Sequence, residues 1–274
     1  PGTLMETSML DEGKSNYLCS VSFADGRAAV CFAELSTGEI HATVFPGAEL
    51  GHIMNEIGAY LPAEAILDDG AASQAELTEF LKSRMNCLTQ RLNELFEYGE
   101  CLAQVNRQFE EQYSGNADKK LSKTVILAVG ALLRYMEGTQ KTDLSHINTL
   151  QMNSGEAYME LDIQTLRSLE LVASLRSQEK KGSLLWVLDK TKTAMGRRML
   201  RSWVLRPLLS PAQISRRQNA VKELFEDSVC RGELMDTLRQ IGDIERLIGK
   251  IVYGSANGRD MRSMWLSLCS VPRA

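Results

Sequence analysis

The chain has 274 residues, of which 44% are hydrophobic and 24% are charged, and its formal net charge at pH 7 is −4. This composition is typical of a globular protein of about two domains. A protein that coats nucleic acid would be strongly basic, so the mild acidity argues against that class while leaving room for a local basic surface. No apolar run reaches the roughly 18 residues of a membrane helix, and no secretory signal pattern opens the chain. We therefore expect no membrane partner.

The first part of the chain has the pattern of an α/β domain. Alternating apolar and polar residues predict three strands over 17–23, 28–35 and 39–45. The Asp25-Gly26 and Thr37-Gly38 pairs between them are typical of tight turns, so the strands form an antiparallel meander. A helix over 48–60, a strand over 63–67 and a helix over 73–85 follow, the last with Ser73 and Glu76 as a capping box. This order is the one found in ribonuclease-H-like folds with a mixed sheet.

Beyond this domain the chain has almost only helical patterns. Long amphipathic helices are expected over 93–113 and 118–136, followed by an irregular stretch over 138–160. Good N-cap residues, Asp162 and the Ser210-Pro211 pair among them, then open a series of helices that continues to 259–268. We expect a linker from a missing N-terminal domain over 1–14, the α/β domain over 15–115, and an all-α domain over 116–274 that is truncated at its C-terminal end.

Cofactor and metal signatures are absent from the sequence. The chain has no glycine-rich phosphate loop of the GxxxxGK[ST] type, so we expect it to hydrolyse no nucleotide. The six cysteines form no CxxC pair and the three histidines are far apart in sequence, which argues against a metal site. Scattered cysteines of this kind are typical of small buried apolar side chains in a reducing compartment.

A ribonuclease-H-like fold raises the alternative of a metal-dependent nuclease. Two-metal cleavage needs several carboxylates that converge on the cations. The strand over 17–23 carries no acid, and the nearby candidates are Asp25, Glu34, Asp68 and Asp69. The sequence therefore favours a structural domain over a nuclease, and we expect no catalytic residue.

The strongest charge feature is a basic stretch over 180–206, in which only Asp189 is acidic. Clustered lysines and arginines on helices can contact DNA phosphates, because binding there releases counterions. The candidates for DNA-backbone or interdomain contacts are Lys190, Lys192, Arg197, Arg198 and Arg201. The alternative is a solvated helix face whose arginines pair with acids such as Glu223, Glu226 or Glu245. Within this stretch Trp186 and Trp203 are expected in the core, and Gly196 is expected at a close contact between helices.

One long motif carries a family resemblance. The residues Leu188-Asp189-x-Thr191-x-Thr193-Ala194-x-Gly196-Arg197-Arg198 closely resemble the core-domain signature of the MutS family of DNA mismatch-repair proteins. Asp243-Ile244-Glu245-Arg246-Leu247 is similar to a later part of the same domain, and Pro1-Gly2-Thr3-Leu4 to the linker before the family's connector domain. The resemblance implies a ribonuclease-H-like connector followed by a helical core at the base of the levers.

The resemblance also implies a function for the longer protein. Members of the family are bacterial cytoplasmic, nucleoid-associated homodimers that detect mismatches in duplex DNA, use ATP and magnesium, and recruit MutL. The family's mismatch-reading and nucleotide-binding residues have no counterpart in this sequence, so the chain is expected to relay the ATP state and dock partners. A further alternative is a stand-alone MutS-like paralogue without the mismatch domain, against which the Pro1-Gly2-Thr3-Leu4 linker argues.

Overall fold

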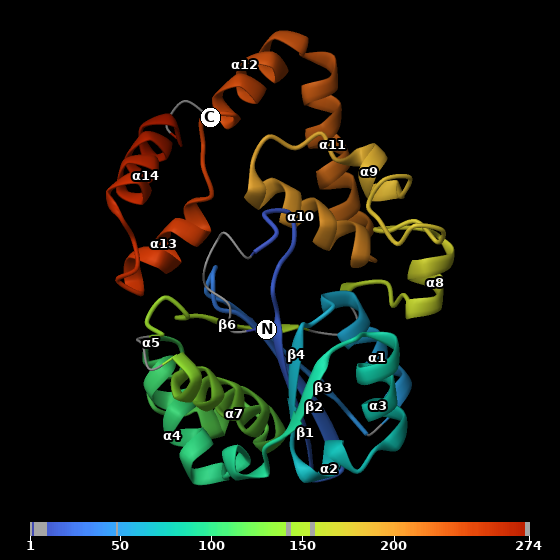
Figure 1. Ribbon diagram of the computed structural model, residues 1–274, viewed down its shortest axis with the longest axis vertical. Coiled ribbons are helices and arrows are strands. Elements are labelled where there is room, and N and C mark those ends of the chain that lie inside the picture. Colours follow the sequence, from blue (N-terminus) through green and yellow to red (C-terminus); the bar gives the residue numbers. More distant parts are fainter. Residues whose placement is uncertain (1, 3–9, 48, 141–143, 154–156, 272–274) are drawn as a thin grey trace. The chain divides into compact units, whose positions relative to one another are not determined.

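The computed structural model describes residues 2, 10–47, 49–140, 144–153 and 157–271. The chain forms two compact units (Figure 1). The α/β unit comprises Pro1–Leu10 and Asn16–Gly155, and the helical unit comprises Asp11–Ser15 and Glu156–Ala274. The chain therefore passes from one unit to the other at three points, after residues 10, 15 and 155.

The α/β unit contains a six-stranded mixed sheet in the order β5-β4-β1-β2-β3-β6. The first three strands form the predicted antiparallel meander, and each of the other three runs parallel to its inner neighbour. The strands are β1 (Leu18–Ala24), β2 (Arg27–Glu34), β3 (Glu39–Phe45), β4 (Glu64–Leu67), β5 (Leu88–Arg91) and β6 (Leu150–Asn153). The mixed sheet is thus confirmed.

The turn between β1 and β2 is the one that the sequence predicts. Ala24 pairs with Arg27, which leaves a two-residue loop of Asp25 and Gly26. Their φ angles are 52° and 71°, the left-handed conformation that a tight hairpin with the twist of its strands requires. Aspartate tolerates this conformation and glycine adopts it freely, so the local sequence sets the register of the hairpin.

Helices cover both faces of the sheet (Figure 1). On one face α7 (Lys123–Gln140) packs on β1, β2 and β3, with α4 (Tyr98–Gln108) outside it. The opposite side carries α1 (Leu50–Tyr60), α2 (Asp69–Ala72), α3 (Ala75–Glu79) and the π-helical turn Phe80–Arg84. The remaining short elements are a 3₁₀ turn (Asn93–Phe96), α5 (Glu110–Tyr113) and α6 (Ala117–Lys120).

Helices α4 and α7 lie unusually close together. A Cβ atom added to Gly130 of α7 would lie 2.5 Å from Cys101 Cβ and 2.6 Å from Cys101 Cα on α4. Such distances are shorter than any van der Waals contact, so only glycine allows this approach. The close approach joins α4 to the layer that α7 forms on the sheet.

The predicted boundary near residue 115 therefore lies too early. Residues 116–155 belong to the α/β unit, because α7 packs on the sheet and β6 pairs with β3. The strong helical periodicity of 118–136 predicts the helix but not the unit on which it packs. Most of the predicted linker over 1–14 lies outside the described residues, and its described last part, Asp11–Lys14, belongs to the helical unit.

Several local predictions also differ from the structure. Strand β5 was not predicted, and the expected helix over 93–113 is divided into a 3₁₀ turn, α4 and α5. Helix α3 has Gln74 as its N-cap with no side-chain cap bond, so the Ser73 capping box is wrong. At α11 Pro211 occupies the first turn as expected, but Ser210 makes no side-chain cap bond.

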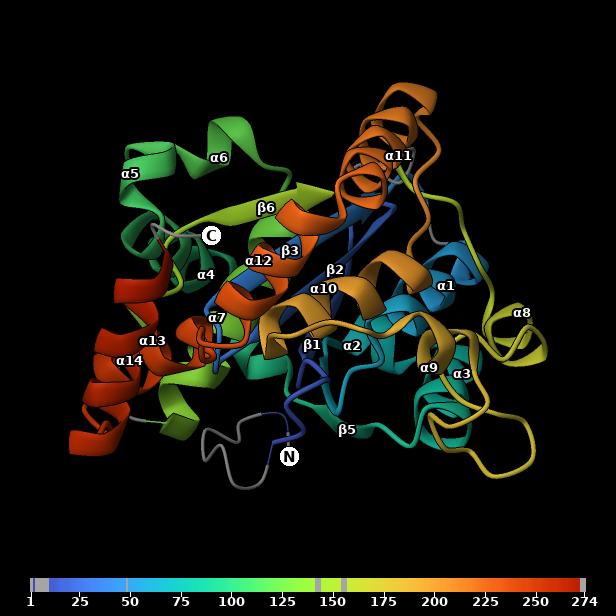
Figure 2. The same ribbon diagram turned by 90° about the horizontal axis from the view of Figure 1, so that it is seen from above.

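The described part of the helical unit, viewed from above in Figure 2, consists of the segment 11–15 and a series of helices. They are α8 (Ile163–Ser168), α9 (Leu184–Leu188), α10 (Ala194–Leu205), α11 (Pro211–Glu226), α12 (Ser228–Leu238), α13 (Ile244–Val252) and α14 (Gly258–Ser270). At the start of six of these helices a side chain accepts a hydrogen bond from a backbone N–H group. The accepting residues are Asp162, Ser183, Thr193, Asp227, Asp243 and Asn257. These bonds satisfy donors that the first turn of a helix otherwise leaves free.

The two tryptophans of the basic stretch do not lie in the core as predicted. Trp186 is 48% exposed and Trp203 is 41% exposed. Arg217 of α11 stacks on Trp203, with its guanidinium carbon 3.6 Å from the ring centroid. The apolar helix faces that carry these rings remain partly open to solvent, which is why their amphipathic pattern did not lead to burial.

Candidate functional site

The basic motif of the helical unit is organised around the carboxylate of Asp189. This side chain is 6% exposed and accepts hydrogen bonds from Thr191 N (3.2 Å) and Thr191 Oγ1 (2.6 Å). Lys180 forms an ion pair with Asp189, and Arg197 Nε lies 3.5 Å from Asp189 Oδ2. Burial raises the pKa of Asp189, but the bonds from Lys180 and Thr191 outweigh it and hold the pKa below 3.8.

The next residues of the motif start helix α10. Thr193 Oγ1 accepts a hydrogen bond of 3.0 Å from Gly196 N, which caps the helix. A Cβ atom on Gly196 would lie 3.0 Å from this same hydroxyl oxygen and 3.7 Å from Thr191 Cβ. The predicted contact between helices at Gly196 is therefore wrong, because the nearest atoms belong to the cap of its own helix.

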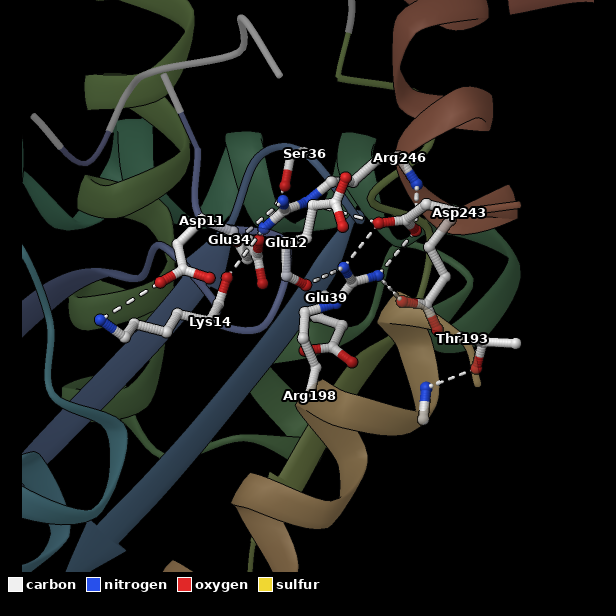
Figure 3. Close-up of polar contacts among 12 residues, drawn as sticks. Asp11, Glu12, Lys14, Glu34, Ser36, Glu39, Thr193, Arg198, Asp243 and Arg246 are labelled. Carbon is white, nitrogen blue, oxygen red and sulfur yellow. Dashed lines mark hydrogen bonds and ion pairs between the residues drawn. The ribbon is translucent and has the colours of Figure 1, made fainter. Parts of the chain in front are cut away.

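Arg198 of α10 is buried in an acidic cluster at the start of α13 (Figure 3). Its guanidinium donates to both carboxylate oxygens of Asp243, at 2.6 and 2.8 Å, and to Glu245 Oε2 at 2.6 Å. Burial lowers the pKa of Arg198, but the hydrogen bonds to the two acids outweigh it and raise that pKa. Burial raises the pKa of Asp243, and the bonds from Arg198 outweigh it, so that pKa lies below 3.8.

Two arginines of this cluster also hold the segment 11–15 through its backbone (Figure 3). Arg246 Nη1 donates to Asp11 O at 3.0 Å, and its Nη2 donates to Lys14 O at 2.8 Å. Arg198 Nη1 adds a bond of 3.3 Å to Glu12 O. The side chain of Arg246 is only 2% exposed, so these carbonyl groups satisfy a guanidinium that has little access to water. We call Arg198, Asp243, Glu245 and Arg246 the clasp, and residues 11–15 the entry segment.

The five predicted contact residues therefore differ in their surroundings. Lys190 is exposed and Lys192 is half-buried, and neither forms an ion pair with any residue that the structure describes. Arg197 lies against Asp189, and Arg198 is committed to the clasp. Arg201 is half-buried, and burial lowers its pKa by more than the negative charge of Asp11 raises it.

The alternative interpretation of the basic stretch is confirmed in part for one residue, because Arg198 pairs with Glu245 as proposed but is buried and does not lie on a solvated helix face. The clasp residues Asp243 and Arg246 had no predicted role. Asp243 had a local signal, since an aspartate before an apolar helix is a typical N-cap. Arg246 had no local sequence signal for its role, because its carbonyl partners lie 232 and 235 positions earlier in the chain.

The carboxylates considered for a nuclease each have a local partner. Asp68 caps α2 and also accepts from Ser22 Oγ and Phe23 N, both at 2.8 Å. Asp69 pairs with Arg91, and Asp25 lies 3.5 Å from Lys123 Nζ. Glu34 is buried and accepts from Ser36 Oγ at 2.7 Å. Within the described ranges, no three acid, histidine or cysteine side chains come close enough to hold a metal ion.

The α/β unit has an open hollow of about 630 Å³ between α4 and α7. Its charged walls are already paired, Arg107 with Glu137 and Arg134 with Glu100. A hollow with two internal ion pairs offers no unbalanced charge to a ligand. The clasp and the basic motif therefore remain the features that best distinguish this chain.

Comparison with known proteins gives these features a family context. The family model described as MutS domain II matches residues 16–148, and the one described as MutS domain III matches residues 164–274. The chain is 41% identical to the DNA mismatch repair protein MutS of Ruminiclostridium cellulolyticum over 274 residues, 99% of this chain and 31% of that protein. The chain belongs to the MutS family. The MutS proteins of Alkaliphilus oremlandii and Acetivibrio thermocellus are 37% and 38% identical, each over 99% of this chain and 31% of the relative.

The family match is consistent with the division seen in the structure. The two matched regions lie on either side of residue 155, where the α/β unit ends. The basic motif and the clasp helices lie in the region of MutS domain III. Residues 1–15, which include the entry segment, lie before both matched regions. The chain spans about 31% of the length of the curated relatives that it matches. Among the described residues, no helix is both long and apolar enough to cross a membrane.

Proposed function

We propose that this chain acts in DNA mismatch repair as the connector and core domains of a MutS protein. The observation that carries this proposal is the match of MutS domains II and III, in that order, along almost the whole chain. In this role the two domains perform no chemistry, and they relay the ATP state between distant mismatch and nucleotide sites. Such coupling needs a linked pair of ordered domains more than it needs a catalytic group.

The proposal extends to the longer protein of which these domains form a part. That protein would bind mismatched duplex DNA as a homodimer, recruit MutL, and use ATP with magnesium in domains that this sequence does not contain. We assign it to the bacterial cytoplasm, in association with the nucleoid. These assignments rest on the resemblance to the family and on the names of the relatives.

We further propose that the α/β unit is a ribonuclease-H-like scaffold without nuclease function. The antiparallel meander followed by parallel strands supports this assignment. The local partners of Asp25, Asp68 and Asp69 support a structural role for these acids. A test is incubation of the chain with RNA–DNA hybrids and magnesium or manganese, for which we expect no cleavage above that of a mock preparation.

Within the basic motif, Lys190 and Lys192 are the residues that we propose as DNA-backbone contacts. Their ammonium groups pair with no described residue, whereas Arg198 already has two acidic partners. Arg197 and Arg201 remain candidates for interdomain contacts. Lysines without an acidic partner bind phosphate without sequence preference and lose affinity as salt rises.

The DNA contacts are tested by measuring binding to a matched duplex and to one with a single mismatch over a salt series. We expect weak, salt-sensitive binding without preference for the mismatch. The double variant Lys190→Ala/Lys192→Ala should reduce the salt slope by about two. Lys222→Ala, which removes an exposed lysine paired with Glu226, serves as the matched control. A mismatch preference that persists at high salt would mean that these domains themselves read the mismatch, contrary to the proposal.

The relay function is tested by a hybrid protein. Residues 1–274 replace the corresponding region of the Ruminiclostridium cellulolyticum protein, and ATP hydrolysis is measured with matched and mismatched DNA. We expect the hybrid to keep a different rate on the two DNAs. A hybrid that hydrolyses ATP equally with either DNA, although both ends remain folded, would overturn the proposed relay.

A further inference from the structure

The entry segment belongs to the helical unit, although chain on both sides of it belongs to the α/β unit. Before it, Gly2 N donates to Glu64 Oε2 of β4 at 3.1 Å, and Asn16 Nδ2 donates to Gly2 O at 3.3 Å. After it, β1 begins at Leu18. The chain therefore leaves the α/β unit after residue 10, is held by the clasp, and returns at residue 16.

Gly2 is attached to the α/β unit through the buried side chain of Glu64. Glu64 is 2% exposed and also accepts hydrogen bonds from Tyr135 Oη and from Gln90 Nε2. Burial raises the pKa of Glu64, but the hydrogen bonds from Tyr135 and from the backbone of Gly2 outweigh it and keep the pKa below 4.5. A Cβ atom on Gly2 would lie 2.5 Å from Leu18 Cδ2, so the backbone packs directly against β1. Both ends of the stretch from Gly2 to Leu18 are thus anchored on the same unit.

Only non-covalent bonds hold the middle of this stretch on the helical unit. The described bonds are those from Arg198 and Arg246 to the carbonyl oxygens of residues 11, 12 and 14. A Cβ atom on Gly13 would lie 2.4 Å from Arg197 Cδ, so the segment also packs closely against α10. If these contacts open, the entry segment is no longer held on the helical unit, and the covalent connection after residue 155 is the one that remains between the units.

We propose that the clasp is a reversible second tether between the two units. When it is closed, three residues separate the held carbonyl of Lys14 from β1, and they span at most about 14 Å over four Cα–Cα steps. While the clasp is closed, this second connection restricts the motion of one unit relative to the other. When the clasp is open, one connection remains and the range of motion increases. This inference stands on the contacts of the helical unit and does not require the proposed function.

Lys14 provides a direct probe of the clasp. Trypsin cleaves after lysine, and the carbonyl of Lys14 is the one that Arg246 Nη2 holds. Its side chain is 59% exposed, so protection of the bond reports on the held backbone and not on burial of the lysine. We expect slow cleavage between Lys14 and Ser15 in the 274-residue chain. In Arg246→Met, the cleavage rate at this bond should rise at least about tenfold, because the open state becomes populated.

Arg239→Met is the matched control, since Arg239 is an exposed arginine of the same unit that pairs with Asp236. Its cleavage rate at Lys14 should equal that of the parent chain. Fluorescence of the three tryptophans, all in the helical unit, verifies that each variant is folded. Unchanged cleavage at Lys14 in a folded Arg246→Met variant would overturn the proposal.

A second variant tests the tether without changing any residue of the clasp. Six Gly and Ser residues inserted between Ser15 and Asn16 lengthen the connection and leave every clasp residue in place. We expect Lys14 to stay protected, while ¹⁵N relaxation gives each unit a shorter rotational correlation time than in the parent. This variant decides the matter even if Arg246→Met does not fold. Identical correlation times in the parent and the insertion variant would show that the entry segment does not restrict the units.

Discussion

The α/β unit encloses its large apolar side chains, whereas the helical unit leaves most of them in contact with solvent. Val21, Phe32, Ile66 and Leu132 are 0% exposed in the α/β unit. Its exposed large apolar residues in the described ranges are Leu88 and Met152, which lie on the two edge strands. In the helical unit the exposed residues include Trp186, Met199, Trp203, Val221, Phe225, Val229, Met261, Trp265 and Leu268.

This difference shows that the two units are stabilised by different kinds of interaction. Burial of apolar surface on both faces of a sheet is non-directional and large, and it stabilises the α/β unit. The helical unit has few side chains buried to a similar degree, such as Leu185 at 2% and Leu205 at 5%. Its helices depend more on directional contacts, namely the caps at their starts and the buried ion pairs of the clasp.

The largest expected effect is a core deletion in the α/β unit. Phe32 is fully buried, and its ring stacks on Tyr60 with centroids 3.9 Å apart. Phe32→Ala should lower the free energy of unfolding by about 3–5 kcal/mol, because it removes this contact and leaves a cavity. The matched change Phe225→Ala, at a residue that is 79% exposed, should cost less than about 0.5 kcal/mol. Urea unfolding followed by far-ultraviolet circular dichroism measures both, and equal losses would remove the distinction between the units.

The next effect concerns the clasp. Arg198→Met leaves Asp243 and Glu245 beside an apolar side chain at a site where the arginine is 6% exposed. We expect a loss of about 2–3 kcal/mol, somewhat below that of a fully buried pair because Asp243 is 18% exposed. Urea unfolding followed by tryptophan fluorescence reports this loss in the helical unit. The control Arg239→Met breaks an exposed pair and should cost no more than about 1 kcal/mol.

A smaller effect is expected from pH. The folded pKa of Asp243 is lowered, so its carboxylate stabilises the folded state above about pH 3.8. That contribution disappears as pH falls through the lower folded pKa. Asp243→Asn should therefore destabilise the helical unit at pH 7 by about 1–2 kcal/mol and make the loss of stability below pH 4 less steep. Fluorescence-monitored unfolding at several pH values tests this, and parallel acid profiles for the two proteins would contradict it.

The smallest effect on stability is expected at the exposed thiols. Burial raises the pKa of Cys87 to about 12 and that of Cys101 to about 11, and it also raises the pKa values of Cys19 and Cys31. Cys230 and Cys269 are exposed. A disulfide reagent should therefore react rapidly with two thiols in the native chain and with six in denaturant. Changing both exposed cysteines to serine should abolish the rapid reaction and alter stability by less than about 0.5 kcal/mol.

Local signals in the sequence predicted local structure well. The Asp25-Gly26 turn, the cap at Asp162 and the proline at the start of α11 all depend on residues within a few positions of one another. Burial was predicted for the cysteines, and this is confirmed for four of the six. Strand β5 escaped prediction because Leu88–Arg91 lies at the sheet edge and is only partly buried, so it lacks an alternating apolar pattern.

Features that depend on distant parts of the chain were not predictable in this way. The packing of α7 on β1 and β2 places residues beyond 115 in the α/β unit, and the sequence near position 115 contains no signal of that packing. The burial of Trp186 and Trp203 was wrongly predicted, because the sequence of an apolar helix face does not indicate whether another part of the protein covers that face. In the candidate site, the motif pointed to Arg197 and Arg198, while the role of Arg246 required the backbone of residues 11–14.

The separation of the clasp from the entry segment has a consequence during protein synthesis. Asp11 is made early, but the guanidinium that holds its carbonyl belongs to a residue 235 positions later. At about 5–20 residues per second, a ribosome needs on the order of 10 to 50 s to make the intervening chain. All strands of the α/β unit are complete well before that point. The α/β unit is therefore free to fold first, and the attachment of the entry segment to the helical unit forms only after α13 has been made.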